Sequence, residues 1–307
     1  MSSLLLFSLV VACTGAPAPE SNLTRVRLAL NWFPEPEFGG FYEGVLGGIY
    51  KDAGFDVEIL PGGPGAPTLE LLSSGKAEAA VTSADDLLLK RQRGVSAVGV
   101  WPGFQLNPAG LMVHAPGPVK FEEIQSGTAA VEVGSPMWTY IWKRNGWEGK
   151  VQAVPYSGGV GPFLADSQLM QQAYITSEPC LVRAQGVEIE FLRSADAGWN
   201  PYGSLVALPD PAPEWAGRFV EATGRAWQSY LDHPERANAE ISRLNDQMRP
   251  ELMGCITEAQ RPFVVGDDGL GAMSADRWEA TAAALVELGL LPAGSSAAGA
   301  WVQPGSP

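Results

Sequence analysis

Residues 28–42 of the chain read LALNWFPEPEFGGFY. The stretch opens with an alternating apolar run that predicts a strand, and the run breaks at Asn31 and Trp32. A glycine pair at 39–40 then leads into a predicted helix. The strand therefore ends in an amide and two aromatic side chains at the carboxyl edge of a sheet, where open α/β sheets hold their ligands. Packing in the hydrophobic core is the alternative role for Trp32 and Phe33.

The composition describes a globular chain with room for two domains. It has 307 residues, of which 46% are hydrophobic. The net charge of −14 argues against nucleic acid as a partner, because phosphate binding requires clustered Lys and Arg. Three cysteines and two histidines are too few for a disulfide scaffold, a zinc site or a His-based triad. We therefore expect no metal and no cofactor.

A targeting segment is predicted at residues 1–24. Residues 4–12 are apolar but too few to span a bilayer as a stable helix, and the run stops at Cys13. The order Val10-Val11-Ala12-Cys13 resembles a bacterial lipobox, in which the cysteine carries a lipid after cleavage. Residues 14–24 are then a polar tether. The alternative is an ordinary cleaved signal with an incidental Cys13, and the basic residues typical of a signal's start are missing.

Strand and helix patterns alternate along the following residues, which is typical of a largely parallel sheet. One helix is predicted over residues 39–50, and Ser83 is positioned to cap another at its N-terminus. A strand is predicted over residues 95–100, ending at Trp101-Pro102. From Pro211 onward the pattern is helical, with helices expected at residues 215–231, 234–248 and 274–288.

The predicted fold class is α/β, with two lobes that are each a mainly parallel sheet flanked by helices. Crossings of the chain near residues 113–119 and 205–211 divide it into a first lobe of residues 25–114 plus 209–307 and a second lobe of residues 115–208. Two such crossings form a hinge that lets the lobes close around a ligand.

Six short segments in this order resemble the periplasmic substrate-binding proteins of ABC transporters, in the nitrate, taurine and thiamine-pyrimidine group. They are LNW (30–32), SGKAE (74–78), GSPMW (134–138), YSGG (156–159), FLAD (163–166) and QAYITSEP (172–179). The resemblance covers residues 25–210. It implies the two-lobed periplasmic-binding-protein fold of type II and a small heteroaromatic ligand, such as a thiamine-pyrimidine precursor, held in the interlobe cleft. The implied partner is an ABC permease, and the implied location is the bacterial cell envelope. We expect a lipid-anchored monomer there, either periplasmic or on the outer face of the cytoplasmic membrane.

The resemblance also raises an enzymatic alternative. The group includes a fungal pyrimidine synthase that uses pyridoxal phosphate, and its pyridoxal-binding lysine and essential histidine correspond to Thr82 and Asp86 here. Neither residue can do that chemistry, because a Schiff base requires an amine. Lys76 and Lys90 are the nearest amines, and both are expected at the surface. The sequence therefore favours a binding protein over an enzyme.

Three candidate site residues suit a flat ligand that carries amines. Trp32 offers a face for stacking on a heteroaromatic ring, and Asn31 offers both donors and an acceptor. Glu178 follows a strand of the second lobe, where its carboxylate can accept a hydrogen bond from an exocyclic amine or pair with a cation. The alternative role for Glu178 is that of a helix N-terminal acid before Pro179.

Weaker candidates share a place in loops or at helix starts, and each has an ordinary structural alternative. The loop Tyr156-Ser157-Gly158-Gly159 can present hydroxyl and backbone N–H groups or be a plain turn. Thr82 and Ser83 can bond the ligand or only cap a helix. Tyr202 can line the cleft or pack the hinge. Cys180 and Cys255 are expected as buried free thiols unless the fold brings them close enough to pair.

None of these cleft candidates is basic, and anionic ligands usually require Arg or Lys. The sequence therefore disfavours nitrate and sulfonates and favours a ring with an amine. Riboflavin stays open as a ligand, because the same aromatic side chains can stack on a flavin.

Overall fold

Two five-stranded sheets organise the computed structural model, which describes residues 23–303. The first sheet has the order β2-β1-β3-β10-β4. Its parallel pairs are β1–β2 and β1–β3, whereas β10 runs antiparallel to both β3 and β4. Its strands are β1 (Thr24–Ala29), β2 (Phe55–Leu60), β3 (Ala79–Thr82), β4 (Ala97–Phe104) and β10 (Gly203–Pro209).

The second sheet has the order β7-β6-β8-β5-β9. Here β6 runs parallel to β7 and β8, and β5 runs antiparallel to β8 and β9. In each sheet one strand opposes the other four, so the predicted fold class of two lobes with mainly parallel sheets is confirmed. The strands are β5 (Ala109–His114), β6 (Gly127–Val131), β7 (Val151–Pro155), β8 (Leu169–Tyr174) and β9 (Ile189–Arg193).

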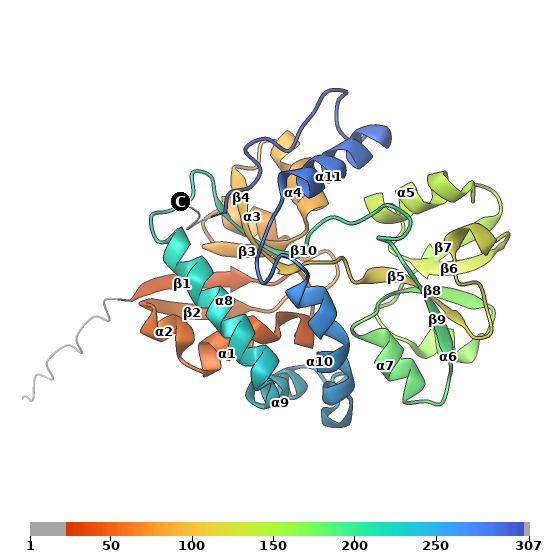
Figure 1. Ribbon diagram of the computed structural model, residues 1–307, viewed down its shortest axis with the longest axis horizontal. Coiled ribbons are helices and arrows are strands. Elements are labelled where there is room, and N and C mark those ends of the chain that lie inside the picture. The colour runs from red at the N-terminus through yellow and green to blue at the C-terminus, as the bar shows by residue number, and fades with distance from the viewer. Residues whose placement is uncertain (1–22, 304–307) are drawn as a thin grey trace, which may run out of the picture.

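Helices flank both sheets, and the two α/β units lie side by side in Figure 1. Those before β5 and after β10 belong to the first unit, and those between β5 and β10 to the second. In chain order they are η1 (Pro36–Phe38), α1 (Gly39–Leu46), α2 (Ile49–Asp52), α3 (Thr68–Ser73), α4 (Ala84–Gln92), η2 (Phe121–Glu123), α5 (Pro136–Asn145), α6 (Gly161–Ala165), α7 (Glu178–Arg183), α8 (Ala216–Asp232), α9 (Glu235–Leu244), α10 (Pro250–Val265) and α11 (Ala275–Glu287).

Helix α1, which follows the Asn31–Trp32 turn, packs closely on α8. A Cβ on Gly40 would lie 2.3 Å from the Trp227 ring, and one on Gly39 would lie 2.1 Å from Tyr230. Only glycine permits this approach, so the pair at the start of α1 is fixed by packing. Phe41 and Trp227 then meet edge to face in the larger core cluster.

The chain crosses between the sheets at residues 105–108 and 194–202, which corrects both expected crossings and the lobe boundaries drawn from them. β5 pairs with strands of the second sheet and β10 with strands of the first. An apolar run predicts a strand but does not tell which partners will complete its hydrogen-bond ladder, so these two strands were assigned to the wrong lobes.

Arg277 of α11 fastens the two crossings together. Its guanidinium donates to the carbonyl oxygens of Gln105 in the first crossing and of Asn200 and Pro201 in the second. It also lies over the Tyr202 ring, 3.9 Å from the centroid. Desolvation lowers the pKa of Arg277 to about 10. A single side chain therefore contacts both segments that connect the two units.

Three local predictions fail for identifiable reasons. The helix expected over residues 39–50 is two helices, because Gly48 adopts the left-handed conformation (φ +73°). β4 does not end at Trp101-Pro102 but continues to Phe104, since an edge strand tolerates proline. The pattern also gave no sign of α10, which contains Pro262 in its interior. Within residues 23–303, no helix is both long enough and apolar enough to cross a membrane.

Candidate functional site

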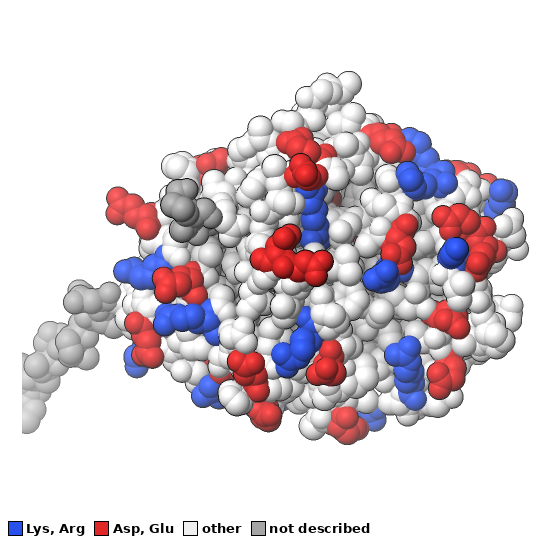
Figure 2. All heavy atoms as spheres, in the orientation of Figure 1, with Lys and Arg blue, Asp and Glu red and all other residues white. Residues whose placement is uncertain are grey.

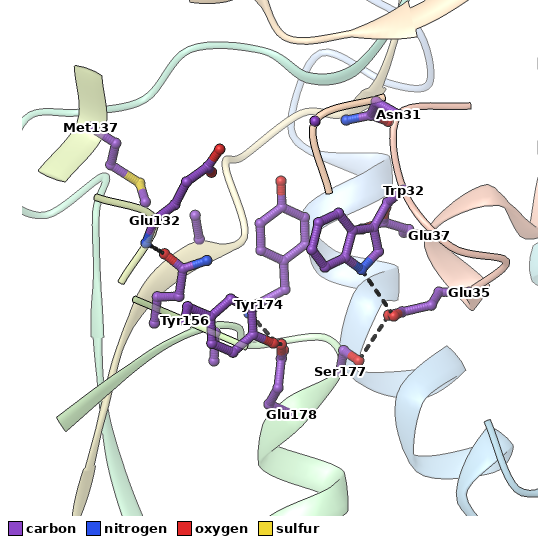
Figure 3. A pocket seen from close by; sticks show the side chains of 14 residues that line it. Asn31, Trp32, Glu35, Glu37, Glu132, Met137, Tyr156, Tyr174, Ser177 and Glu178 are labelled. Carbon is purple, nitrogen blue, oxygen red and sulfur yellow. Dashed lines mark hydrogen bonds between the residues drawn. The ribbon is translucent and has the colours of Figure 1, made fainter. Parts of the chain in front are cut away.

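A cavity of about 200 Å³ lies between the two units, at the carboxyl ends of β1, β6, β7 and β8. Its lining residues come from both units, and Figure 3 shows them in close-up. Carboxyl ends of parallel strands meet at one edge of a sheet, so two such edges facing each other create this hollow. The position matches the edge at which the sequence placed Asn31 and Trp32.

The wall from the first unit includes Asn31, Trp32, Glu35 and Glu37, which follow β1, and Gly65, which follows β2. Trp32 is half-buried, and its indole Nε1 donates to Glu35 Oε1 at 3.2 Å. The Asn31 Oδ1 atom is buried and has no hydrogen-bond partner among the described residues.

The wall from the second unit centres on Glu178, the first residue of α7. Its Oε1 atom accepts from the Tyr156 hydroxyl at 2.7 Å, and its Oε2 atom accepts from the Tyr174 backbone N–H at 2.9 Å. The Tyr174 ring projects into the hollow opposite Trp32 in Figure 3. Tyr156 and Tyr174 thus fix the carboxyl group at the cavity wall through two donated hydrogen bonds.

One hydrogen bond joins the cavity wall of the first unit to that of the second. Ser177 Oγ of the second unit donates to Glu35 Oε2 of the first at 3.1 Å (Figure 3). Trp32, Glu35 and Ser177 form a short chain of contacts from one unit to the other. The two units are therefore in direct contact beside the cavity.

The cavity is acidic. Glu35, Glu37, Glu132 and Glu178 line it, and none of its described lining residues is Lys, Arg or His. Burial, reinforced by the neighbouring Glu178 carboxyl, raises the pKa of Glu35 from 4.5 to about 8. Burial also raises the pKa of Glu178 and, together with Glu35, raises that of Glu37 well above its usual range. Figure 2 shows Lys and Arg interspersed with Asp and Glu on the outer face that it draws, whereas nothing in this lining offers a positive charge to an anionic ligand.

The structure brings four of the predicted site residues together: Asn31, Trp32, Tyr156 and Glu178 line the same cavity. The other six are not among its lining residues. Thr82 donates to Asp86 at 3.0 Å, and Ser83 accepts from the Asp86 N–H as the N-cap of α4. Tyr202 is buried at the hinge, where its hydroxyl accepts from the Ser274 N–H at 2.9 Å. The remaining three are Ser157, Gly158 and Gly159, in the loop before α6.

Several lining residues were missed from the sequence. Glu35 and Glu37 lie in the very stretch that was quoted first, but a Pro-Glu-Pro-Glu run is typical of a solvated turn. Glu132 and Met137 follow β6, and Gln172, Tyr174 and Ser177 surround the end of β8. The usable signal was position after a strand, applied to all of the parallel strands and not only to those before Asn31, Tyr156 and Glu178.

Other sequence expectations have mixed outcomes. Of the two alternatives left open for Cys180 and Cys255, the structure has the disulfide and not the free thiols. Lys76 is exposed and Lys90 pairs with Glu70, and neither lines the cavity. Among residues 23–303, no group of three His, Cys, Asp or Glu side chains is arranged to hold a metal ion. Cys13 lies outside the described residues.

Solved structures with low sequence identity share this fold. The periplasmic aliphatic sulphonate binding protein SsuA of Escherichia coli matches with a TM-score of 0.68 at 14% identity, covering 91% of this chain and 92% of that one. The alkanesulfonate-binding protein SsuA of Xanthomonas axonopodis pv. citri, bound to MOPS, matches with a TM-score of 0.66 at 10% identity, covering 91% and 98%. Two α/β lobes with a cavity between them define a periplasmic-binding-protein fold.

The chain belongs to the NMT1/THI5-like family, which matches residues 35–237. Among its relatives, the riboflavin-binding protein RibY of Chloroflexus aurantiacus is 25% identical, over 92% of this chain and 86% of the relative. The formylaminopyrimidine-binding protein of Halalkalibacterium halodurans is 21% identical, over 91% and 90%. The predicted family resemblance is confirmed.

Proposed function

We propose that this protein is the extracytoplasmic binding component of an ABC importer and that it captures a flat nitrogen heterocycle carrying amino groups. The observation that carries the proposal is the cavity's chemistry: an indole face beside buried carboxyl groups, with no basic side chain among the described lining residues. Rings stack on the indole, and amines donate to carboxylates.

Several polar groups of the cavity can accept a hydrogen bond from a ligand donor. The carboxyl oxygens of Glu178 and Glu35 are such acceptors at its wall. An aminopyrimidine supplies such donors from a ring small enough to lie against Trp32. This chemistry supports a thiamine-pyrimidine precursor ahead of nitrate or a sulfonate, because those anions would meet the carboxylates without a balancing cation.

The names of the two relatives support a flat nitrogen heterocycle, and one of them also supports the amine. One relative is named for riboflavin, a flat heterocycle without an exocyclic amino group, and the other for formylaminopyrimidine, which carries one. Riboflavin is the second candidate ligand, since its ring also stacks on an indole. The sulfonate-binding neighbours support only the fold, because their sequences are 10–14% identical to this chain.

Attachment to the cell surface is part of the proposal. The Val10-Val11-Ala12-Cys13 segment supports a lipid on Cys13, which would hold a monomeric binding protein beside its permease in the envelope. Mass spectrometry of the protein expressed in a bacterium with lipoprotein processing tests this step. A mature N-terminus at Cys13 with a diacylglycerol mass supports the anchor, and cleavage at any other residue contradicts it.

A thermal-shift panel tests the ligand class. The panel contains formylaminopyrimidine, riboflavin, an alkanesulfonate and nitrate, each titrated into purified protein. We expect the unfolding midpoint to rise with an amine-bearing heterocycle and to stay unchanged with the two anions, since a ligand that binds only the folded state stabilises it. A midpoint that rises only with the sulfonate or nitrate contradicts the proposal.

The same samples separate binding from catalysis. A binding protein returns its ligand unchanged, so chromatography of the bound fraction after long incubation should recover the added heterocycle alone. Pyridoxal phosphate added to the protein should show no absorbance shift, because Thr82 stands where the pyrimidine synthase carries its lysine. A shifted absorbance band or a chemically altered ligand would instead support an enzyme.

A further inference from the structure

The Cys180–Cys255 disulfide joins the two units of the molecule. Cys180 lies in α7, between β8 and β9 of the second sheet, whereas Cys255 lies in α10, which packs on β4, η1 and α9 of the first unit. Figure 1 shows α7 and α10 next to each other where the units meet. Because the two cysteines belong to different lobes, the disulfide restrains the position of one lobe relative to the other.

This bond is a third covalent link, additional to the two chain crossings, and it lies away from them. The Gln105 and Leu106 N–H groups of the first crossing donate to the Phe263 carbonyl of α10, at 2.6 and 3.1 Å. Cys255 precedes Phe263 by eight residues, which is about 12 Å along a helix. Rotation of one unit about the crossings would therefore move Cys255 relative to α7.

The bond leaves almost no room for such movement. Disulfides hold their Cα atoms within about 7 Å of each other, and those of Cys180 and Cys255 are already 6.1 Å apart. The neighbouring contact between units, from Ser177 to Glu35, is a single hydrogen bond that opening can break. Ser177 and Glu178 line the cavity and lie within three residues of Cys180, so the bond restrains the cavity's own wall.

We propose that Cys180 and Cys255 form a thiol–disulfide site that sets how far the lobes open. In the oxidised protein α7 stays against α10 and the cavity opens only narrowly. In the reduced protein the lobes separate further, and a bound molecule leaves faster. The effect on ligand release depends on the proposed function, whereas the effect on lobe separation does not.

The site is open to exchange from one side. Cys255 is exposed, and Cys180 is 3% exposed. A thiolate of a dithiol attacks Cys255 Sγ, forms a mixed disulfide and releases the Cys180 thiolate, which takes up a proton. The second thiol of the reagent then displaces Cys255 Sγ, which also leaves as a thiolate and is protonated. The chain gains two electrons and two protons, and the dithiol becomes a disulfide.

Small-angle X-ray scattering tests the proposal without any ligand. The radius of gyration of the wild-type protein is measured with and without dithiothreitol, beside the Cys180→Ser/Cys255→Ser double variant under both conditions. We expect the reduced wild type to be larger than the oxidised one and equal to the double variant. The double variant should not respond to dithiothreitol, which excludes an effect through Cys13.

One radius shared by the oxidised and reduced wild type would overturn the proposal, provided that mass spectrometry confirms reduction and circular dichroism confirms folding. This comparison holds even where the double variant fails to fold. Stopped-flow dissociation of riboflavin, followed by its fluorescence, then measures release. Slower release from the reduced protein would contradict the second part, whereas no riboflavin binding in either state would count against riboflavin as a ligand and leave the scattering result unaffected.

Discussion

Trp32 presents a half-buried indole to the cavity, with its N–H already bonded to Glu35. Since the N–H is occupied, the ring face is what it offers to a ligand. Trp32→Ala should weaken binding of the heterocycle roughly 5- to 150-fold, or about 1–3 kcal/mol, the range for loss of an aromatic stacking partner. Trp32→Phe should lose less, because a ring remains.

Calorimetric titration measures both variants, and Phe33→Ala is the matched control. Phe33 contacts the Trp32 ring edge to face but is 38% exposed and is not a lining residue of the cavity. Equal affinities for Trp32→Ala and the wild type would show that the indole belongs only to the protein's own packing.

Glu178 is the carboxyl group that we propose as the acceptor for a ligand amine. Glu178→Gln keeps the shape of the side chain and removes its charge, so affinity for an amine-bearing ring should fall about 10- to 100-fold, the worth of a hydrogen bond to a charged group. Glu188→Gln, at an exposed site in the same unit, should bind as the wild type does. Unchanged affinity in Glu178→Gln would assign the residue to holding Tyr156 alone.

The raised pKa of Glu35 determines how the free energy of unfolding should depend on pH. Its pKa is about 8 in the folded protein and 4.5 ordinarily, so the folded state keeps a proton that the unfolded state releases between these values. The free energy of unfolding of the unliganded protein should therefore fall as the pH rises from about 4.5 to 8. Glu35→Gln should make this decline shallower, and exposed Glu148→Gln should not. Urea unfolding at several pH values measures the free energy of unfolding. If this free energy depended on pH in the same way for Glu35→Gln and the wild type, the prediction would be refuted.

At the scale of elements, substitutions of Ser83 distinguish a role in capping α4 from a role in binding the ligand. Its side chain caps α4, and it is not a lining residue of the cavity. Ser83→Ala should lower the free energy of unfolding by about 1 kcal/mol and leave ligand affinity unchanged, whereas Ser83→Asn should restore stability as an alternative cap. Urea unfolding measures the stability, and calorimetry measures the affinity. A Ser83→Ala variant with wild-type stability and weaker ligand binding would show that Ser83 contacts the ligand.

Elements whose identity is a local property were predictable. The strand β1 and the cap of α4 follow from an alternating apolar run and from one serine. The break at Gly48 and the length of β4 were not, because they depend on a left-handed turn and on the strand's edge position. Sequence patterns carry local preferences, whereas the ends of elements are set by neighbours that lie far away in the chain.

At the scale of the molecule, the two-lobed class was predictable and the crossings were not. Which sheet receives β5 depends on its pairing with β8 and β9 from later in the chain. The same limit applied to the site. Trp32 and Glu178 were chosen as candidates because each follows a strand, but only the arrangement of the two units reveals that Glu35 meets Ser177.

The central claim is that amine donors on a flat ring are what the acidic cavity selects. Calorimetric titration of a matched ligand pair tests it most directly: an aminopyrimidine and the same ring with a methyl group in place of the exocyclic amine. Both rings stack equally on Trp32, but only one donates to Glu178. We predict that the amine binds at least about tenfold more tightly, or about 1.4 kcal/mol. Equal affinities, or tighter binding of the methyl compound, would contradict the claim.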